Sequence, residues 1–264
     1  MKITVIGSGN MGGALIKGFM KADACGEEGL QLTITAKTQS TLERFLNDFP
    51  SLNTSLDNRA AVDGADVIIL AVKPWLIEKV VAEIRDVVDL KKQMVVSVAA
   101  NVSTAKLLEL FGQAEGNVFY AMPNIAAEFG ESMTFVAAAD KVNADTTDKV
   151  KALFEKVGAV KVVEERLVAS GMMMAGCGIA YVMRYIRAMM EGGVEMGFYP
   201  KDAQTIAMQT MKGAITLLEE TGLHPEAAID KVTTPGGVTI KGLNELDHSG
   251  FNSAVIRSLK AGLK

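Results

Sequence analysis

The segment best suited to chemistry lies near the C-terminal end of the chain, at residues 231–247, where the sequence reads KVTTPGGVTIKGLNELD. Gly236 and Gly237 follow a proline and offer unhindered backbone N–H groups, and an apolar pattern at helical spacing begins directly after them. N–H groups at the start of a helix favour a small anion such as a carboxylate. Thr234 and Thr239 could then supply hydroxyl groups to a second polar atom of the same ligand.

The same segment lacks the Lys–Asp, Ser–His and Tyr–Lys arrangements that are typical of strong acid–base catalysis. This absence favours a substrate that needs little help with proton transfer, and a protonated imine is one such substrate. The competing interpretation is that Thr239 only caps a helix that follows a proline turn.

A second chemical segment is the glycine-rich turn GSGNMG at residues 7–12, which separates a β-rich run from residues at helical spacing. In this context the glycines let the backbone approach a pyrophosphate, and the helix N-terminus supplies N–H groups and the positive end of its dipole. The pattern predicts a dinucleotide site, with a plain strand-to-helix turn as the alternative.

The end of the next predicted strand, 32–36, indicates which dinucleotide is bound. A fold that prefers NAD usually carries Asp or Glu at this strand end, where the acid accepts from the ribose hydroxyls. This chain instead continues with KTQS at 37–40. The cation Lys37 beside hydroxyl and amide groups suits a 2′-phosphate, so the sequence favours NADPH, with NADH as the second possibility. An ordinary surface lysine is the competing interpretation.

Strands and helices alternate up to about residue 160. The apolar runs 67–72, 94–100 and 117–122 are typical of parallel strands that are buried on both faces. The alternation predicts an α/β fold, in which an N-terminal Rossmann-like doubly wound parallel sheet is followed by an all-helical dimerisation domain. We place the boundary after Glu164, with a NAD(P)-binding domain at 1–164 and a helical substrate-binding and dimerisation domain at 165–264.

The helical half is apolar on more than one face. Nine of the 15 methionines lie between Met172 and Met211, and methionine commonly fills irregular apolar gaps in cores and interfaces. Helices of this kind need a second surface to cover them, so we expect a homodimer built through this half.

Composition argues against several other classes. The net charge of −4 comes without a basic patch, which argues against nucleic acid and anionic membranes as partners. No apolar run approaches the roughly 18 residues of a membrane-spanning helix, and the chain enters its first strand without a signal peptide. Cys25 and Cys177 lack a motif spacing, which favours reduced thiols in a cytoplasmic protein. With two histidines and no Cys/His cluster, a metal site is not expected.

The segment DKVTTPGGVTIKGLNELD closely resembles the signature of the pyrroline-5-carboxylate reductase family. The resemblance continues along the chain in IGSGNMGGAL, AVKPW, SVAANVSTAKL, AMPNIAA, GCGIAYV and SGFNSAVIRSL. It implies a Rossmann domain joined to a helical domain that dimerises by intertwining, with decamers in some members. It also implies reduction of the cyclic imine 1-pyrroline-5-carboxylate to L-proline with NAD(P)H, the last step of proline biosynthesis.

The resemblance assigns roles to individual residues. Gly236, Gly237 and Val238 would bind the substrate carboxylate through their N–H groups, with help from Thr234. Thr239 would hydrogen-bond the ring nitrogen and relay the proton. The residues implied to line the cofactor are Ile6, Gly7, Ser8, Gly9, Asn10, Met11, Lys37, Thr38, Asn58, Ala71, Val72, Lys73, Pro74, Val98, Ala99, Ala100 and Asn124.

The chain also departs from the common family pattern. Tyr120 stands where the family usually has Arg, Ile125–Ala126 where it has Thr-Pro, and Asn101 where it has Gly; AGCGIAY at 175–181 replaces SGSGPAY. Two other functions therefore stay open, namely a reductase of another small imine and a non-catalytic NADPH-binding sensor or interaction module. A keto or β-hydroxy acid dehydrogenase usually carries a catalytic lysine on the long helix, and this chain has none from 164 to 200.

Overall fold

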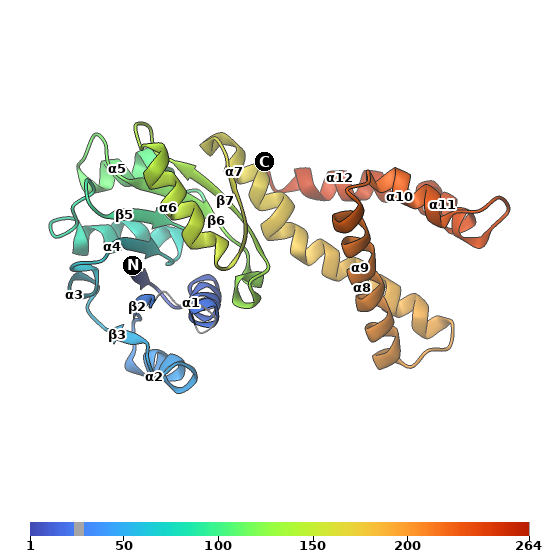
Figure 1. The fold of residues 1–264 in the computed structure, drawn as a ribbon, viewed down its shortest axis with the longest axis horizontal. Helices are drawn as coiled ribbons and strands as arrows, with labels where there is room; N and C mark the ends of the chain where they lie inside the picture. The colour runs from blue at the N-terminus through green and yellow to red at the C-terminus, as the bar shows by residue number, and fades with distance from the viewer. Residues whose placement is uncertain (24–28, 264) are drawn as a thin grey trace. The chain divides into compact units, whose positions relative to one another are not determined.

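The computed structural model describes residues 1–23 and 29–263, which divide into two compact units, Met1–Gly176 and Cys177–Lys264 (Figure 1). Cys25, which the sequence predicts to be a reduced thiol, lies outside the described residues. A sheet with covering helices forms the first unit and helices alone form the second, as the sequence predicts. The first unit extends beyond residue 164 because Val168 is buried against Tyr120, Met122 and Ala137 of the sheet.

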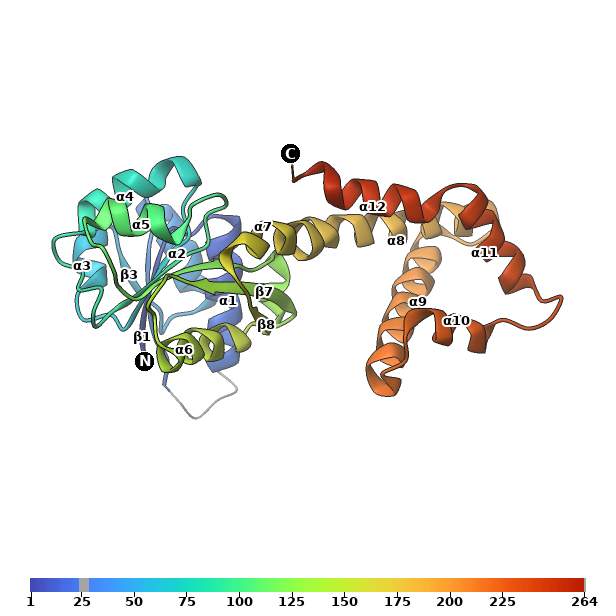
Figure 2. The same ribbon diagram turned by 90° about the horizontal axis from the view of Figure 1, so that it is seen from above.

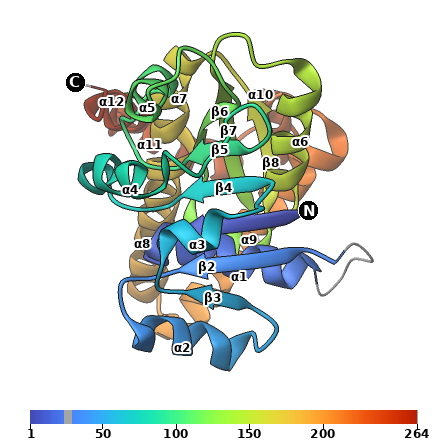
Figure 3. The same cartoon turned by 90° about the vertical axis from the view of Figure 1, so that its left-hand side faces the viewer.

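The first unit is built on one eight-stranded sheet in the order β3-β2-β1-β4-β5-β6-β7-β8, which Figure 3 shows along the row from β3 to β8. All neighbours are parallel except β6 and β7. Every residue of β4 and β5 is buried, as expected for strands covered on both faces. The strands are β1 (Lys2–Ile6), β2 (Gln31–Thr35), β3 (Asn53–Ser55), β4 (Val67–Leu70), β5 (Met94–Ser97), β6 (Val118–Met122), β7 (Ser132–Ala138) and β8 (Gly158–Val162).

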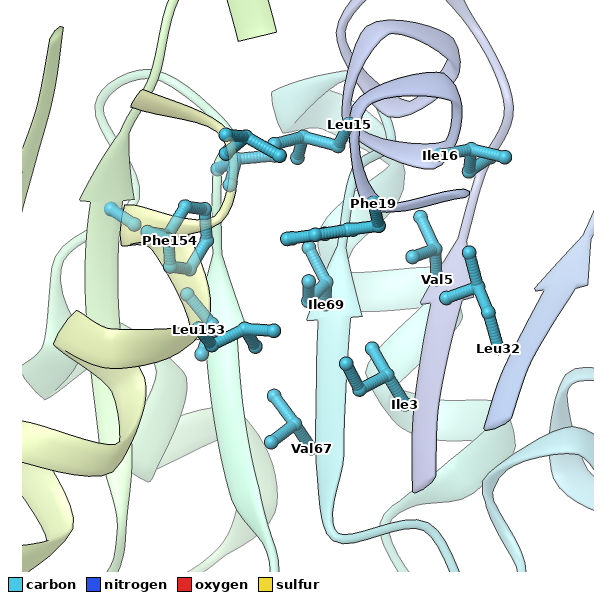
Figure 4. Close-up of a cluster of buried hydrophobic side chains, with 14 of the residues drawn as sticks. Ile3, Val5, Leu15, Ile16, Phe19, Leu32, Val67, Ile69, Leu153 and Phe154 are labelled. Carbon is cyan, nitrogen blue, oxygen red and sulfur yellow. The ribbon is translucent and has the colours of Figure 1, made fainter. Parts of the chain in front are cut away.

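Helices cover both faces of this sheet, so alternate residues of each strand enter different cores. One core joins α1 and α6 to the sheet, and Phe19 meets Phe154 there edge to face, with ring centroids 6.2 Å apart (Figure 4). The other core joins α4 and α5 to the opposite face (Figure 2). The helical segments of this unit are α1 (Asn10–Asp23), α2 (Gln39–Asp48), α3 (Asn58–Val62), η1 (Pro74–Leu76), α4 (Ile77–Ile84), α5 (Thr104–Phe111), η2 (Ile125–Phe129), α6 (Ala144–Glu155), η3 (Glu165–Leu167) and α7 (Val168–Gly171).

The antiparallel pair β6–β7 differs from the uniformly parallel sheet that the sequence predicts. Phe119 pairs with Ala138 and Met122 with Phe135 in this pair. The short η2 turn joins the two strands directly, and only an antiparallel neighbour can be reached by so short a connection.

The second unit has almost no core of its own. Among its described residues, the apolar side chains that are buried belong to Ala203, Ala207 and Ala228. Gly193 lets α8 approach α9, since a Cβ there would lie 3.0 Å from Cβ of Ala203. The described helices are the π-helical turn η4 (Met172–Cys177), which leads into the unit, α8 (Gly178–Glu195), α9 (Pro200–Thr221), α10 (Pro225–Val232), α11 (Val238–His248) and α12 (Phe251–Ala261).

One expectation about this region needs correction. By length and composition alone, the helical segment Glu165–Glu195 could cross a membrane, because an 18-residue window of it has a mean hydropathy of 1.4 and only 22% of that window is buried. The sequence search for an unbroken apolar run missed it because small and polar residues interrupt the apolar ones. One such helix is weak evidence for a membrane span, since apolar helices of other proteins pass the same test.

Candidate functional site

A cavity of about 760 Å³ opens at the carboxyl edge of the sheet, beside the glycine-rich turn. This is the position where open α/β sheets bind ligands. All the residues predicted to line the cofactor are found in its wall except Thr38 and Asn124. The lining comprises Ile6, Gly7, Ser8, Gly9, Asn10, Met11, Thr35, Ala36, Lys37, Thr41, Leu56, Asn58, Ala71, Val72, Lys73, Pro74, Leu76, Lys79, Val80, Glu83, Val98, Ala99, Ala100 and Ile125.

The glycines of the turn are required by close approaches of the backbone. Gly7 has φ +99°, a conformation that side chains rarely adopt, and a Cβ there would lie 2.8 Å from the Ala71 carbonyl oxygen. A Cβ on Gly12 would lie 2.0 Å from the Gly7 carbonyl oxygen, so helix α1 can sit against the turn only without a side chain. At Gly9 a Cβ would meet no atom within 4 Å, which leaves open space in the wall of the cavity.

The chemistry of the lining fits a dinucleotide phosphate. Helix α1 begins at Asn10, and the first N–H groups of a helix have no intrahelical partner. These groups and the helix dipole favour an anion beside the turn. Lys37, Lys73 and Lys79 also line the cavity, against the single carboxylate of Glu83. The net positive wall therefore suits the phosphates of NAD(P).

The adenosine ribose of a Rossmann ligand is read at the end of β2, which here is Thr35. Lys37 and Thr41 from this region line the cavity. The Thr38 hydroxyl instead lies 2.9 Å from the Thr41 hydroxyl and 3.2 Å from that of Ser40. Cofactor binding by Thr38 stays a prediction, with Thr41 as the neighbouring hydroxyl that the structure brings into the wall.

The end of β5 forms the other side of the cavity through Val98, Ala99 and Ala100. The turn that follows contains Asn101 with φ +62°, a left-handed conformation that is uncommon outside glycine. The Asn101 N–H donates to the hydroxyl oxygen of Tyr120 at 3.1 Å. Burial raises the pKa of the Tyr120 hydroxyl above its ordinary value, so the group is neutral at physiological pH. Two departures from the family pattern therefore meet in one hydrogen bond beside the cavity.

Asn124 is buried and engaged with the protein. Its backbone N–H donates to the Ser132 hydroxyl at 3.0 Å, and its side-chain oxygen accepts from the Ala126 N–H at 2.9 Å, which caps η2. The side-chain nitrogen lies 3.4 Å from the Ala175 carbonyl oxygen. The next residue, Ile125, lines the cavity instead, and direct cofactor contact by Asn124 stays a prediction.

In the second unit, the threonine–glycine segment forms a tight turn between α10 and α11. Proline precedes Gly236, whose φ of +73° is what the third position of a type II turn requires. The Gly237 N–H closes the turn by donating to the Thr234 carbonyl oxygen at 2.9 Å, so this N–H is already engaged, contrary to the expectation of a free group. Among the described residues, the Gly236 N–H donates to no backbone or side-chain group, and the Val238 N–H, at the first residue of α11, has no intrahelical partner.

Thr234 and Thr239, the two threonines of the predicted substrate site, are both exposed residues. Gly237 is the N-cap of α11, without a side-chain cap, so Thr239 lies inside the first turn and does not cap the helix. Within the described part of the chain, the hydroxyls of Thr234 and Thr239 form no hydrogen bond. The turn thus offers two hydroxyl groups and the N-terminus of a helix of 11 residues, and its substrate-binding role stays a prediction.

Sequence reasoning missed Lys79 and Glu83, which come from α4 and line the cavity. A signal for them existed, because Leu76, Lys79, Val80 and Glu83 follow the Lys73–Pro74 loop at spacings of three and four residues. Such spacings place side chains on one face of a helix. The face that meets the cofactor follows from the position of this loop at the sheet edge.

A larger cavity of about 910 Å³ lies beside α5 and the end of β8. None of the predicted site residues lines it. Its charged residues include Lys141 and Arg166, whose side chains pair with Glu115 and Glu164 at the surface. Without a phosphate-binding turn, it does not match the predicted chemistry, and we assign the functional site to the smaller cavity.

Both halves of the chain match known family models. Residues 165–264 match the family model described as pyrroline-5-carboxylate reductase dimerisation, and residues 2–101 match the model described as NADP oxidoreductase, coenzyme F420-dependent. The predicted boundary after Glu164 coincides with the start of the first match, although the compact units divide later.

Individual relatives extend the likeness over the full chain. A pyrroline-5-carboxylate reductase of Synechocystis sp. is 33% identical across 100% of this chain and 96% of its own length. Pyrroline-5-carboxylate reductase 1 of Dictyostelium discoideum is 35% identical over 97% of this chain, which spans about half of that relative, 48%. The solved structure of a Coxiella burnetii pyrroline-5-carboxylate reductase superposes with a TM-score of 0.89 at 28% identity, covering 98% of this chain and 95% of the other. The chain therefore belongs to the pyrroline-5-carboxylate reductase family.

Proposed function

We propose that the protein is an NADPH-dependent reductase that converts 1-pyrroline-5-carboxylate to L-proline in the cytoplasm, the last step of proline biosynthesis. The observation that carries this proposal is the cavity at the glycine-rich turn, whose wall contains nearly every residue predicted to line the cofactor. Relatives of this name align over the whole chain, including the threonine–glycine turn.

When bound, NADPH supplies a hydride from its nicotinamide ring to the imine carbon. The residues of this chain bind, orient and exclude water. The turn at residues 7–12 would hold the pyrophosphate. Tyr120 accepts from the Asn101 N–H and so would keep the wall at residues 98–100 in place. The N–H groups of Gly236 and Val238 and the start of α11 would bind the substrate carboxylate, with Thr234 beside it; the Gly237 N–H, also predicted to do so, is engaged within the turn. The Thr239 hydroxyl oxygen accepts a hydrogen bond from the N–H of the protonated imine, and the nitrogen keeps this proton when the carbon–nitrogen double bond becomes a single bond.

The test is oxidation of NADPH by the purified protein with 1-pyrroline-5-carboxylate, followed by absorbance and by identification of the product. Saturable formation of L-proline is expected. NADPH binding without turnover would contradict the proposal and favour either another cyclic imine or a non-catalytic role, which a panel of small imines separates.

Thr239→Ala tests the hydrogen bond assigned to Thr239. A hydrogen bond to a charged group is worth about 1.5–3 kcal/mol, so kcat should fall roughly 10- to 150-fold while NADPH affinity is unchanged. Thr233→Ala is the matched control, because the Thr233 hydroxyl already donates to the Asp230 carbonyl oxygen at 3.1 Å. Equal losses in turnover and NADPH binding would contradict the role given to Thr239.

We further propose that the second unit forms a homodimer, with a decamer as the larger alternative. Large apolar residues of this unit are exposed to solvent, with exposed fractions of 77% for Met196, 80% for Tyr199 and 83% for Val238. A unit whose described core contains only three alanines cannot offset the entropy of ordering its helices by itself. The family model matched here is described as a dimerisation domain, which favours a second copy, and not a membrane, as the cover for Glu165–Glu195. A monomeric mass by light scattering at micromolar concentration would contradict this assembly.

A further inference from the structure

The part of the cavity around the end of β2 contains both signs of charge. The acid that NAD-preferring folds carry at this strand end is missing here, and Lys37 follows instead. However, Glu83 reaches the same cavity from α4, more than 40 residues after the end of β2. A carboxylate thus enters this cavity from another element.

Glu83 is held in this position by a chain of hydrogen bonds. The buried Thr35 hydroxyl donates to the side-chain oxygen of Asn58 at 2.6 Å, and the Asn58 side-chain nitrogen donates to Glu83 Oε2 at 2.7 Å. Because a hydroxyl donor lies on one side and a carboxylate acceptor on the other, the orientation of the amide is fixed. Asn58 keeps one further N–H for a ligand oxygen, and Glu83 keeps its second carboxylate oxygen.

The two lysines near these hydrogen bonds form no ion pair with the protein in the described residues. Lys37 and Lys79 line the same cavity, and neither is part of an ion pair in the described residues. Lys79 and Glu83 lie one helical turn apart on α4, so the two charges stand side by side. A ligand at this place meets two ammonium groups and one carboxylate.

We propose that Glu83 is the acid that binds the ribose hydroxyls of NADH in this enzyme and that Lys79 acts with Lys37 on the 2′-phosphate of NADPH. The carboxylate accepts hydrogen bonds from the free ribose hydroxyls of NADH. The lysines attract the additional phosphate of NADPH, which Glu83 repels. The proposal rests on the proposed function for the identity of the cofactor and replaces the argument that the absent acid at β2 disfavours NADH.

The experiment measures binding of NAD⁺ and NADP⁺ by calorimetry without substrate, together with the fragments 5′-AMP and adenosine 2′,5′-bisphosphate. Glu83→Gln keeps an oxygen for Asn58 and removes only the charge. This change should lower the affinity for NAD⁺ and 5′-AMP about tenfold. The affinity for NADP⁺ and adenosine 2′,5′-bisphosphate should either rise or fall by less than about twofold. Lys79→Met should weaken NADP⁺ and adenosine 2′,5′-bisphosphate about threefold to fivefold, and NAD⁺ by less than about twofold.

Glu78→Gln and Lys91→Met are matched controls, since neither residue lines the cavity, and both should bind all four ligands like the original protein. Equal weakening of both cofactors by Glu83→Gln, or none, would overturn the assignment of Glu83. If Lys79→Met lowered the affinities for NAD⁺ and NADP⁺ equally, or changed neither, the role assigned to Lys79 would be overturned. Absence of turnover to proline leaves this binding test intact, whereas failure of the original protein to bind either dinucleotide overturns the proposed function together with this inference.

Discussion

The close approach of α1 to the glycine-rich turn gives a sharp test of the site. In Gly12→Ala, the new Cβ would lie 2.0 Å from the Gly7 carbonyl oxygen, 3.0 Å from its carbon and 3.1 Å from Cβ of Ala71. Alanine gains about 1 kcal/mol of helix propensity over glycine. Overpacking costs about 1–3 kcal/mol, and the upper part of this range applies because the atom that is struck belongs to the backbone and cannot rotate away.

The net result should be a loss of roughly 1–2 kcal/mol. At about 2–4 °C per kcal/mol for a unit of this size, the midpoint of thermal unfolding should fall by roughly 2–8 °C. Displacement of α1 also moves its free N–H groups away from the pyrophosphate, so NADPH affinity should fall as well. Differential scanning fluorimetry and calorimetric titration measure the two effects separately.

Gly9→Ala is the matched control. Its Cβ would meet no protein atom within 4 Å, so the midpoint should stay within about 2 °C, whereas the methyl group enters the cavity wall and should weaken NADPH at least about tenfold. The reasoning would be refuted by a Gly12→Ala protein with the original midpoint and affinity. A Gly9→Ala protein that loses as much stability as Gly12→Ala would refute it equally.

Three further outcomes follow from hydrogen bonds and burial. Tyr120→Phe removes the acceptor of the Asn101 N–H, worth about 0.5–1.5 kcal/mol, so the KM for NADPH should rise roughly 2- to 10-fold; the circular dichroism spectrum should not change. Because the pKa of Tyr120 is raised in the folded state, the unfolded chain loses this proton first, and stability is lost as the pH rises above about 10. Denaturant titrations should therefore show that the free energy of unfolding falls less steeply with alkaline pH in Tyr120→Phe than in the original protein. Glu165→Ala removes the carboxylate that accepts from the Thr104 N–H and hydroxyl at the start of α5, which should lower stability by about 1–2 kcal/mol, whereas the exposed Glu164→Ala should change it by less than about 0.5 kcal/mol; equal effects would contradict this role.

Much of the fold could be predicted from the sequence because the relevant signals are local. The segment GSGNMG between a strand and a helix predicts a tight turn. Glycine is required there because Gly7 has a positive φ and because a side chain at Gly12 would collide with the backbone of Gly7. The buried runs at β4 and β5 and the helix Thr104–Phe111 follow from hydrophobic patterns of a few residues. In the same way, Pro235 and Gly236 determine the type II turn before α11.

The tertiary structure decided which distant side chains meet. Thr35, Asn58 and Glu83 are 23 and 25 residues apart along the chain, and they come together only because the strand order places β2 and β4 on either side of β1. Tyr120 reaches Asn101 because β5 and β6 are neighbours. Periodicity records which face of an element is buried but not which element covers it. The sequence therefore predicted where a dinucleotide would bind, whereas the packing of α4 decided that Lys79 and Glu83 line the same cavity.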